Sequence, residues 1–387
     1  MTTTASVVCW WFLVARRCQK LAGLCPLPGG EPPCPCHIGE IASLENLFAA
    51  ATLARRGKSR RPDVEAWWLR RESEIGRLHE ELLSGEWQPG GYRTFLIYEP
   101  KRREISAAPF ADRVVHHALC RKLAPVLERR FIPRSYSCPM DKGTGAARAC
   151  CRRLTNTHRH VLKCDVAKFF PSLDHAILRE RLWQFVECAG TRQLIERILD
   201  SHRTTGWPAP VVLPGEEMLA AAVRARGLPI GNLTSQLWGN FCLDALDHWV
   251  TEKERHGAYL RYTDDFLLFS DDKARLWELR DGIIARLSEC RLRLSLPKSR
   301  LLTTREGVPF CGFRFLPGKA PRILGATKRR FESRCRLMQA DSSWADVSRF
   351  VRHWYRFSVE GNTTGLRRSY AGPRATASTL TASLQSP

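Results

Sequence analysis

Alternating apolar and polar positions mark a short buried hairpin in the second half of the chain. Two runs rich in aromatic and aliphatic residues, 259–262 and 266–270, flank the adjacent carboxylates Asp264 and Asp265. Such runs are typical of β-strands, and the two-residue break between them predicts a tight turn. A turn of this length favours Asn-Gly or Asp-Gly because its backbone needs positive φ. Asp-Asp suits a hard cation better, since bound Mg²⁺ would relieve the repulsion between the carboxylates. An exposed polar turn is the alternative, which the apolar flanking runs disfavour.

A further acid ends an apolar run upstream. Residues 161–166 predict a buried strand, and period-two alternation places Asp165 on the face opposite Leu162, Cys164 and Val166. Asp165 can meet the hairpin acids only if the two strands adjoin in one sheet. In that arrangement the carboxylates could bridge two Mg²⁺ ions, the scheme of metal-dependent phosphoryl transfer on nucleic acid.

Helical spacing of apolar residues dominates the rest of the chain. Ser172 is the expected N-cap of one helix, and Asn232 or Thr234 that of another. The predicted helices cover 44–53, 64–83, 172–185, 233–249 and 274–289, and further strands cover 92–98, 292–296 and 310–315.

The charge balance points to an anionic partner. Lys and Arg number 61 against 39 Asp and Glu, a formal net charge of +22. Nucleic acid is the first candidate partner and an anionic membrane the second, but no apolar run approaches the roughly 20 residues of a spanning helix. The 15 scattered cysteines fit reduced thiols in a cytoplasm better than a disulfide framework. We therefore expect a cytoplasmic protein with no membrane partner.

The two ends of the chain differ from its middle. Residues 1–42 hold five cysteines among prolines and glycines without a CxxC pair, which predicts a poorly ordered leader rather than a zinc site. No positive charge precedes the apolar run 7–15, so no signal peptide is expected. Residues 371–387 are rich in Ser, Thr and Ala and predict a disordered tail.

Three stretches, taken together and in order, resemble the reverse transcriptases. The box 262–265 (YTDD) is similar to their YxDD turn, 164–175 resembles the motif that carries their first catalytic aspartate, and 310–313 resembles their primer grip. The resemblance covers roughly residues 43–320. It implies an α/β (α+β) right-hand polymerase with fingers, palm and helical thumb. It also implies that Asp165, Asp264 and Asp265 are catalytic and that they hold two Mg²⁺ ions together with Val166.

The same resemblance implies a set of substrate contacts. Lys101 and Arg103 match residues that touch the incoming triphosphate, and Lys298 matches a lysine near the pyrophosphate. Phe170 occupies the position of a steric gate against ribonucleotides, and Val166 lies beside the nucleotide. These assignments come from the family and not from spacing.

One stretch resembles a particular subfamily of the reverse transcriptases. Most reverse transcriptases carry Gln-Gly where this chain has Ile230-Gly231, and the run to Gln236 is similar to the IGxxxSQ signature of diversity-generating retroelements. The match implies that Ile230, Gly231 and Gln236 contact substrate. Ile230 cannot donate the hydrogen bond of a glutamine amide, so discrimination of the base pair should fall. Enzymes of that group copy a template RNA with frequent errors at adenines, and the cDNA diversifies a target gene. The signature also occurs in related bacterial enzymes with other roles.

We therefore expect an RNA-directed DNA polymerase that makes cDNA from deoxynucleoside triphosphates. The predicted domains are a leader (1–42), fingers and palm (43–320), a helical thumb (321–370) and a tail (371–387). Expected partners are a template RNA, the RNA–cDNA duplex and a small accessory variability protein. The alternatives are a retron-like, intron-derived or defence-associated reverse transcriptase, or a degenerate palm that only binds structured RNA.

Overall fold

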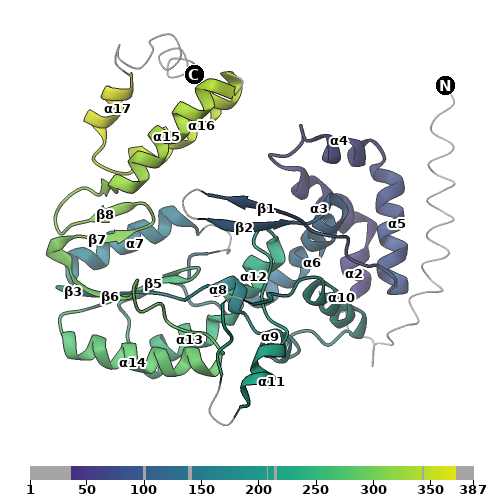
Figure 1. Cartoon of the computed structure of the whole chain (residues 1–387), viewed down its shortest axis with the longest axis horizontal. Helices are drawn as coiled ribbons and strands as arrows, with labels where there is room; N and C mark the ends of the chain where they lie inside the picture. Colours follow the sequence, from purple (N-terminus) through teal and green to yellow (C-terminus); the bar gives the residue numbers. More distant parts are fainter. Residues whose placement is uncertain are drawn as a thin grey trace.

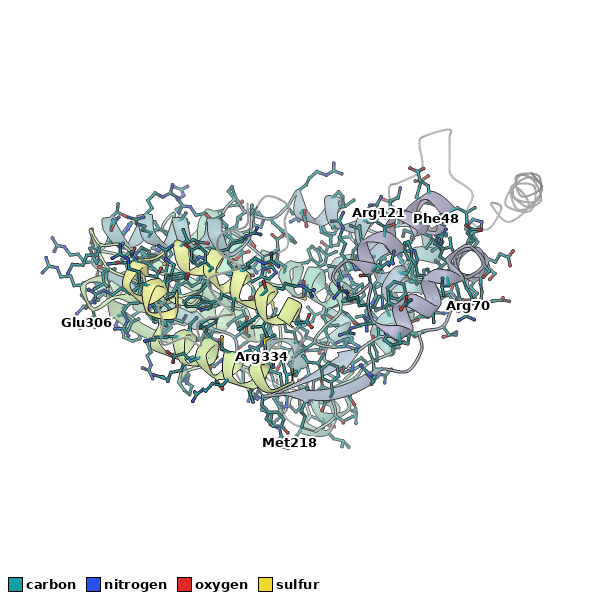
Figure 2. The ribbon with its side chains drawn as sticks, turned by 90° about the horizontal axis from the view of Figure 1, so that it is seen from above. Phe48, Arg70, Arg121, Met218, Glu306 and Arg334 are labelled. Carbon is teal, nitrogen blue, oxygen red and sulfur yellow. The ribbon has the colours of Figure 1, made fainter. Side chains whose placement is uncertain are left out.

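A computed structural model describes residues 36–98, 102–137, 142–206, 208–212, 216–341 and 344–371. The predicted mixed α and β architecture is confirmed. A helical region lies at one end and a region that contains a β-sheet at the other (Figure 1). A β-hairpin of residues 93–107 lies between them, and the helices of residues 325–371 form a separate group (Figure 1). Seen from above, Arg70 and Arg121 lie at the helical end and Glu306 at the opposite end (Figure 2).

The helical end, the fingers, is built from amphipathic helices around one apolar core. Its helices are α2 (Ile38–Ala42), α3 (Leu44–Arg55), α4 (Pro62–Leu69), α5 (Arg71–Ser84) and α6 (Phe110–Glu128). The predicted single helix 64–83 is wrong, because the chain leaves helical geometry at Arg70 (ψ 16°) and starts α5. Residues 36–42 belong to this core, with Cys36, Ile41 and Ala42 buried, so the predicted leader is too long at its C-terminal end. Residues 1–35 lie outside the described residues.

A two-stranded antiparallel hairpin leads from the fingers helices toward the rest of the molecule. It consists of β1 (Arg93–Ile97) and β2 (Arg103–Ala107), with Phe95 opposite Ile105. Most of its side chains are exposed on β1 and at the start of β2. Only the end of β2 is covered, where Ser106 is buried.

The palm is a four-stranded antiparallel sheet in the order β4-β5-β3-β6. Its strands are β3 (His160–Asp165), β4 (Tyr259–Tyr262), β5 (Asp265–Ser270) and β6 (Arg300–Thr303). Alternation sends Leu162 and Cys164 into the large core shared with the fingers, while Val161 and Phe269 enter a second, smaller core. Asp165 lies four residues after Val161 on β3, so its side chain is on the same face of the sheet, the face that carries the smaller core.

Helices cover both faces of the palm sheet. The helices and π-turn of this region are α7 (Thr144–Thr157), α8 (Phe169–Ser172), α9 (His175–Leu182), α10 (Ala189–Asp200), α11 (Met218–Val223), α12 (Leu233–Cys242), α13 (Asp244–His248), η2 (Trp249–Lys253) and α14 (Lys273–Glu289). The predicted cap Ser172 is wrong, because Asp174 accepts the N–H groups of Ala176 and Ile177 at the start of α9. The predicted helix 233–249 is divided at Leu243 into α12 and α13.

A small sheet joins the palm to the thumb. Its strands are β7 (Val308–Phe310), β8 (Phe313–Phe315) and β9 (Arg322–Ile323), and the turn η3 (Thr304–Glu306) precedes it. The predicted strand 310–315 is therefore a hairpin that turns at Cys311 and Gly312, both with positive φ. The predicted strand 292–296 is also wrong, because within the described residues this stretch makes one isolated bridge, from Leu294 to Val166.

The thumb is helical, as predicted. It consists of α15 (Gly325–Asp341), α16 (Trp344–Val359) and α17 (Thr364–Ala371). Phe331 of α15 stacks on Trp354 of α16, with ring centroids 3.9 Å apart. Arg148 of α7 pairs with Glu360 and lies 5.3 Å from the Phe357 ring, which fastens the thumb to the palm. The predicted tail lies outside the described residues from 372 onward.

Candidate active site

The register of the palm sheet brings the predicted acids together. Asp165 ends β3 and lies directly opposite Asp265, the first residue of β5. Directly opposed residues of antiparallel strands have Cβ atoms roughly 4.5–5.5 Å apart. The predicted adjacency of the two strands is thus confirmed, and it comes from pairing over the whole length of β3.

The hairpin turn differs from its prediction by one residue. Thr263 and Asp264 form the turn, and Tyr262 pairs with Asp265 across it. The positive φ that a tight turn needs is supplied by Thr263, at 54°. Asp264 therefore lies at the tip, while Asp265 is fixed in the sheet.

Two lysines pair with two of the acids. The family resemblance placed Lys298 near the pyrophosphate, but sequence reasoning paired neither lysine with an acid. Lys163 Nζ donates to Asp265 Oδ2 at 2.8 Å and to the Pro309 carbonyl at 3.1 Å. Lys298 Nζ donates to Asp165 Oδ1. Lys163 lies two residues before Asp165 on β3, so both side chains are on the same face of the sheet. A lysine inside an otherwise apolar strand was the signal that could have identified Lys163 as a partner of the acids.

Burial and mutual repulsion raise the pKa values of the turn acids. The pKa of Asp264 is raised by burial and by the charge of Asp165. Burial also raises the pKa of Asp265, with Asp165 and Asp264 adding to the rise and Lys163 opposing it. Carboxylates that repel one another in a poorly hydrated site favour a bound cation.

The carboxylate oxygens of these acids are suitable ligands for a divalent ion. Asp265 Oδ1 is buried and has no hydrogen-bond partner within the described residues. A buried carboxylate oxygen without a donor is costly, and a hard cation would satisfy it. Across the described ranges no three carboxylate, imidazole or thiol side chains converge into a ready metal cage, and Lys163 and Lys298 occupy one oxygen each of Asp265 and Asp165.

The predicted subfamily loop joins the palm to the fingers hairpin. The Ile230 carbonyl accepts the Ser106 N–H of β2 at 3.1 Å. Gly231 has φ 127°, and a Cβ there would lie 3.3 Å from Ile105. Both the backbone conformation and this close approach favour glycine at 231. Ile230 is half-buried, while Gln236 is exposed on the first turns of α12.

Phe170 lies beside this loop. Its carbonyl accepts the Leu228 N–H at 2.9 Å, and its ring is 5.3 Å from that of Phe169. Gly239 of α12 faces both rings, and a Cβ there would be 3.3 Å from the Phe170 ring. Phe170 is half-buried and Phe169 fully buried, so only Phe170 keeps part of its ring accessible.

The other predicted contacts are spread around the acids. Arg103 is exposed on β2, and Lys101 lies outside the described residues. Val166 follows Asp165 directly, and its N–H donates to the Asp264 carbonyl at 3.3 Å. The predicted primer-grip residues form the β7–β8 turn, where burial and the charge of Asp265 raise the pKa of Cys311 to about 12.

Sequence reasoning also missed a buried polar cluster behind the turn. Arg261, Asp247 and Asn240 are all buried, and Arg261 donates hydrogen bonds to both Asp247 and Asn240. An arginine between the apolar residues of β4, on the same face as Tyr259, was the available signal.

Comparisons with known proteins agree with this architecture. Residues 99–315, more than half of the chain, match the family described as reverse transcriptase (RNA-dependent DNA polymerase). The chain belongs to this family. The matched domain is an RNA-directed DNA polymerase, a nucleotidyltransferase, which confirms the predicted class of enzyme. No curated protein matches the sequence.

Several solved structures are similar to parts of the chain. Telomerase from Candida albicans in complex with a fragment of telomeric RNA has 12% identity and a TM-score of 0.43, covering 70% of this chain and 53% of that one. A partial Cas6-RT-Cas1–Cas2 complex has 18% identity and a TM-score of 0.36, covering 65% of this chain and 42% of that one. The chain thus spans about half, or less, of the length of these proteins. None of the helices in the described ranges is long and apolar enough to cross a membrane.

Proposed function

We propose that this chain synthesises cDNA on an RNA template by two-metal phosphoryl transfer. The observation that carries the proposal is the register of β3 and β5, with Asp165 opposite Asp265 and Asp264 at the adjoining turn. The family match supports the polymerase reaction, and the net charge of +22 supports a nucleic-acid partner. Template RNA, the RNA–cDNA duplex and deoxynucleoside triphosphates are the proposed partners.

Asp165, Asp264 and Asp265 would hold two Mg²⁺ ions, with the Val166 carbonyl as a further ligand. Ions held there would supply the chemistry of lowering the pKa of the primer hydroxyl and neutralising the leaving pyrophosphate. In the reaction the primer 3′-oxygen forms a bond to the α-phosphorus, the bond to pyrophosphate breaks, and the hydroxyl proton leaves. Asp265 Oδ1 would be open to an ion, whereas Lys163 would have to release Asp265 Oδ2, and Lys298 Asp165 Oδ1, before those oxygens could bind one.

Lys298 has a second role in this proposal. Its ammonium group pairs with Asp165, and once released from that acid it would meet the pyrophosphate oxygens, where a point charge stabilises the leaving group. Arg103 and Lys101 would contact the triphosphate from the fingers hairpin. Phe170 would lie under the ribose and exclude a 2′-hydroxyl, which its partial exposure beside α12 supports.

We further infer an error-prone enzyme of a diversity-generating retroelement, acting with a small accessory protein. The Ile230 side chain offers only apolar contact in the loop that precedes α12 and hydrogen-bonds to β2, where a glutamine would offer a hydrogen bond. Gly231 and Gln236 complete the proposed contacts with the nucleotide and template. A retron-like, intron-derived or defence-associated reverse transcriptase is the alternative within the family.

Primer extension by the Asp264→Asn variant tests the catalytic assignment. The substitution removes one ligand charge at nearly constant shape, so we expect Mg²⁺-dependent extension to vanish while the fold persists. Asp281→Asn is the matched control, because Asp281 is an exposed acid on α14 paired with Arg280. Wild-type extension by Asp264→Asn, with its circular dichroism spectrum intact, would contradict the proposal.

A further inference from the structure

Arg261 is the most deeply buried charged side chain near the catalytic turn. Its exposed fraction is 0%, and so is that of its partner Asp247 on α13. Arg261 Nε donates to Asp247 Oδ1 at 2.8 Å, and Nη2 donates to Oδ2. The Tyr259 hydroxyl donates to the same carboxylate at 2.6 Å, so the pair is well satisfied. A bidentate pair of this kind fixes both partners in orientation as well as in distance.

The remaining nitrogen of the guanidinium reaches the turn itself. Arg261 Nη1 donates to the Thr263 carbonyl at 3.1 Å. Thr263 is the residue with φ 54°, a conformation that β-branched residues seldom adopt. It directly precedes Asp264 in the chain. The buried Arg261 guanidinium therefore stabilises this unusual turn through a hydrogen bond to its backbone.

The same nitrogen also connects the turn to α12. Arg261 Nη1 donates to Asn240 Oδ1 at 2.6 Å, and Nη2 donates to the Asn240 carbonyl at 3.2 Å. Asn240 Nδ2 in turn donates to the Ser137 carbonyl at 2.9 Å. α12 begins just after the Ile230–Gly231 loop, so the cluster joins the acid-bearing turn to the helix behind the proposed nucleotide site.

We propose that Arg261, Asp247 and Asn240 are positioning residues that set the Asp264 turn against α12. The inference rests on the proposed role of Asp264 as a metal ligand. A buried ion pair does not by itself imply stability, because well-packed apolar residues often replace such pairs without loss. A guanidinium whose donors all have partners, one of them the Thr263 carbonyl, is better explained by the need for one turn geometry.

The decisive variant replaces the whole pair rather than one partner. Tyr259→Phe/Asp247→Leu/Arg261→Met removes the ion pair and its third member together, so no buried charge is left unpaired. We expect a folded protein whose Mg²⁺ activation midpoint is raised about tenfold or more. We expect kcat to fall roughly 10- to 100-fold because the acids are misplaced, with the KM for deoxynucleotide changed little. Tyr259→Phe alone is the control, since it keeps every contact of Arg261, and it should behave as wild type.

Mn²⁺ binding to the enzyme without nucleic acid gives a readout independent of activity. Titration followed by electron paramagnetic resonance should show weaker Mn²⁺ binding in the triple variant by the same factor as the Mg²⁺ midpoint. A folded triple variant with wild-type Mn²⁺ affinity and Mg²⁺ midpoint would overturn the proposal. If the triple variant does not fold, the same two measurements are made on Arg261→Lys. This variant keeps a positive charge facing Asp247 but loses the guanidinium nitrogen that donates to the Thr263 carbonyl.

Asp264→Asn, measured alongside, separates this inference from the proposed function. If that variant keeps Mn²⁺ binding and extension, the metal assignment itself fails. If it loses both while the folded Arg261 variants keep them, Asp264 holds the metal and Arg261 is structural only.

Discussion

The palm sheet and the fingers hairpin hold charged side chains in opposite ways. In the palm sheet, Phe266 and Leu268 are fully buried, and Asp165 and Asp265 are fixed by the pairing of β3 with β5. In the fingers hairpin, Phe95 is 42% exposed, and Arg103 lies on an accessible strand end. The palm therefore fixes its charges before any ligand arrives, while the fingers leave theirs free to meet one.

This contrast follows from the number of partners that each strand has. β3 pairs with β5 on one side and β6 on the other, and helices cover both faces of its sheet. Among the strands of the described ranges, β1 and β2 pair only with each other. An isolated hairpin is marginally stable, so β1 and β2 depend on contacts such as that from Ser106 to Ile230. Carboxylates that are already held in position suit catalysis of phosphoryl transfer. A hairpin with accessible cationic side chains suits binding of a phosphate chain.

The first prediction compares the loss of one phenylalanine from each sheet. Phe266→Ala should lower the free energy of unfolding by roughly 3–5 kcal/mol, because it leaves a cavity in a closely packed core. Phe95→Ala should cost less than about 1 kcal/mol, since its ring is 42% exposed. Urea denaturation followed by circular dichroism measures both values.

Equal losses for the two variants would contradict the contrast between the sheets. A large loss for Phe95→Ala alone would mean that the hairpin packs against a surface that the described residues do not show. The slope of the transition with urea should stay unchanged for both variants, which checks that neither alters the unfolded state.

Much of the palm could be predicted from the sequence because its alternation is regular. The period-two pattern of 161–166 assigned Asp165 to the correct face, and the adjacency of the two strands was the condition under which Asp165 could meet the hairpin acids. The turn could not be predicted to the residue, because Thr263 adopts positive φ against its own preference. Its support comes from Arg261, and no local pattern shows that contact.

Long-range partners account for the other differences. Nothing near Lys163 or Lys298 in the sequence indicates which acid each one meets, since their ion pairs span the sheet. Helix divisions were missed where apolar spacing runs on through a break, as at Arg70 and Leu243. Neither break falls at a glycine or proline, so the local sequence carries no helix-stop signal there.

The second prediction concerns α6, the helix that connects the hairpin to the palm helix α12. Burial raises the pKa of Asp112 to about 6 and lowers that of His116 to about 3. The folded state thus binds the Asp112 proton more tightly than the unfolded chain does, so this group destabilises the fold above pH 6 and stops doing so as pH falls towards 4. His116 stays neutral when folded while the unfolded chain takes up a proton near its ordinary pKa of 6.5, so stability falls below that pH.

Two variants should therefore shift stability with opposite pH dependence. Asp112→Asn should be more stable than wild type at pH 7.5, by roughly 3 kcal/mol at most, and the difference should shrink by pH 4.5. His116→Met should gain roughly 3 kcal/mol more over wild type on passing from pH 7.5 to 4.5. Unfolding free energies at both pH values measure this, and differences that do not change with pH would show that the two groups titrate normally.

The third prediction tests the junction between the two regions, where Ile230 accepts a hydrogen bond from β2 through its backbone. Its side chain gives only apolar contact, so correct and incorrect base pairs should be held nearly equally. A glutamine amide would add one hydrogen bond, worth roughly 0.5–1.5 kcal/mol, or up to about tenfold in discrimination. Ile230→Gln should therefore lower misincorporation, most clearly opposite template adenine. Sequencing of cDNA made by both enzymes on one adenine-containing template measures the change.

Ile230→Leu is the matched control for this measurement, because it keeps the volume and the apolar character of the side chain. It should leave the error spectrum as in wild type, so any change confined to the glutamine variant belongs to the hydrogen bond and not to repacking of the loop. The backbone link to Ser106 should survive in both variants, since it does not involve the side chain. Equal adenine error rates in wild type and Ile230→Gln would remove Ile230 as the cause of infidelity. The retroelement assignment would then lose its main support, while the metal site of the palm would be unaffected.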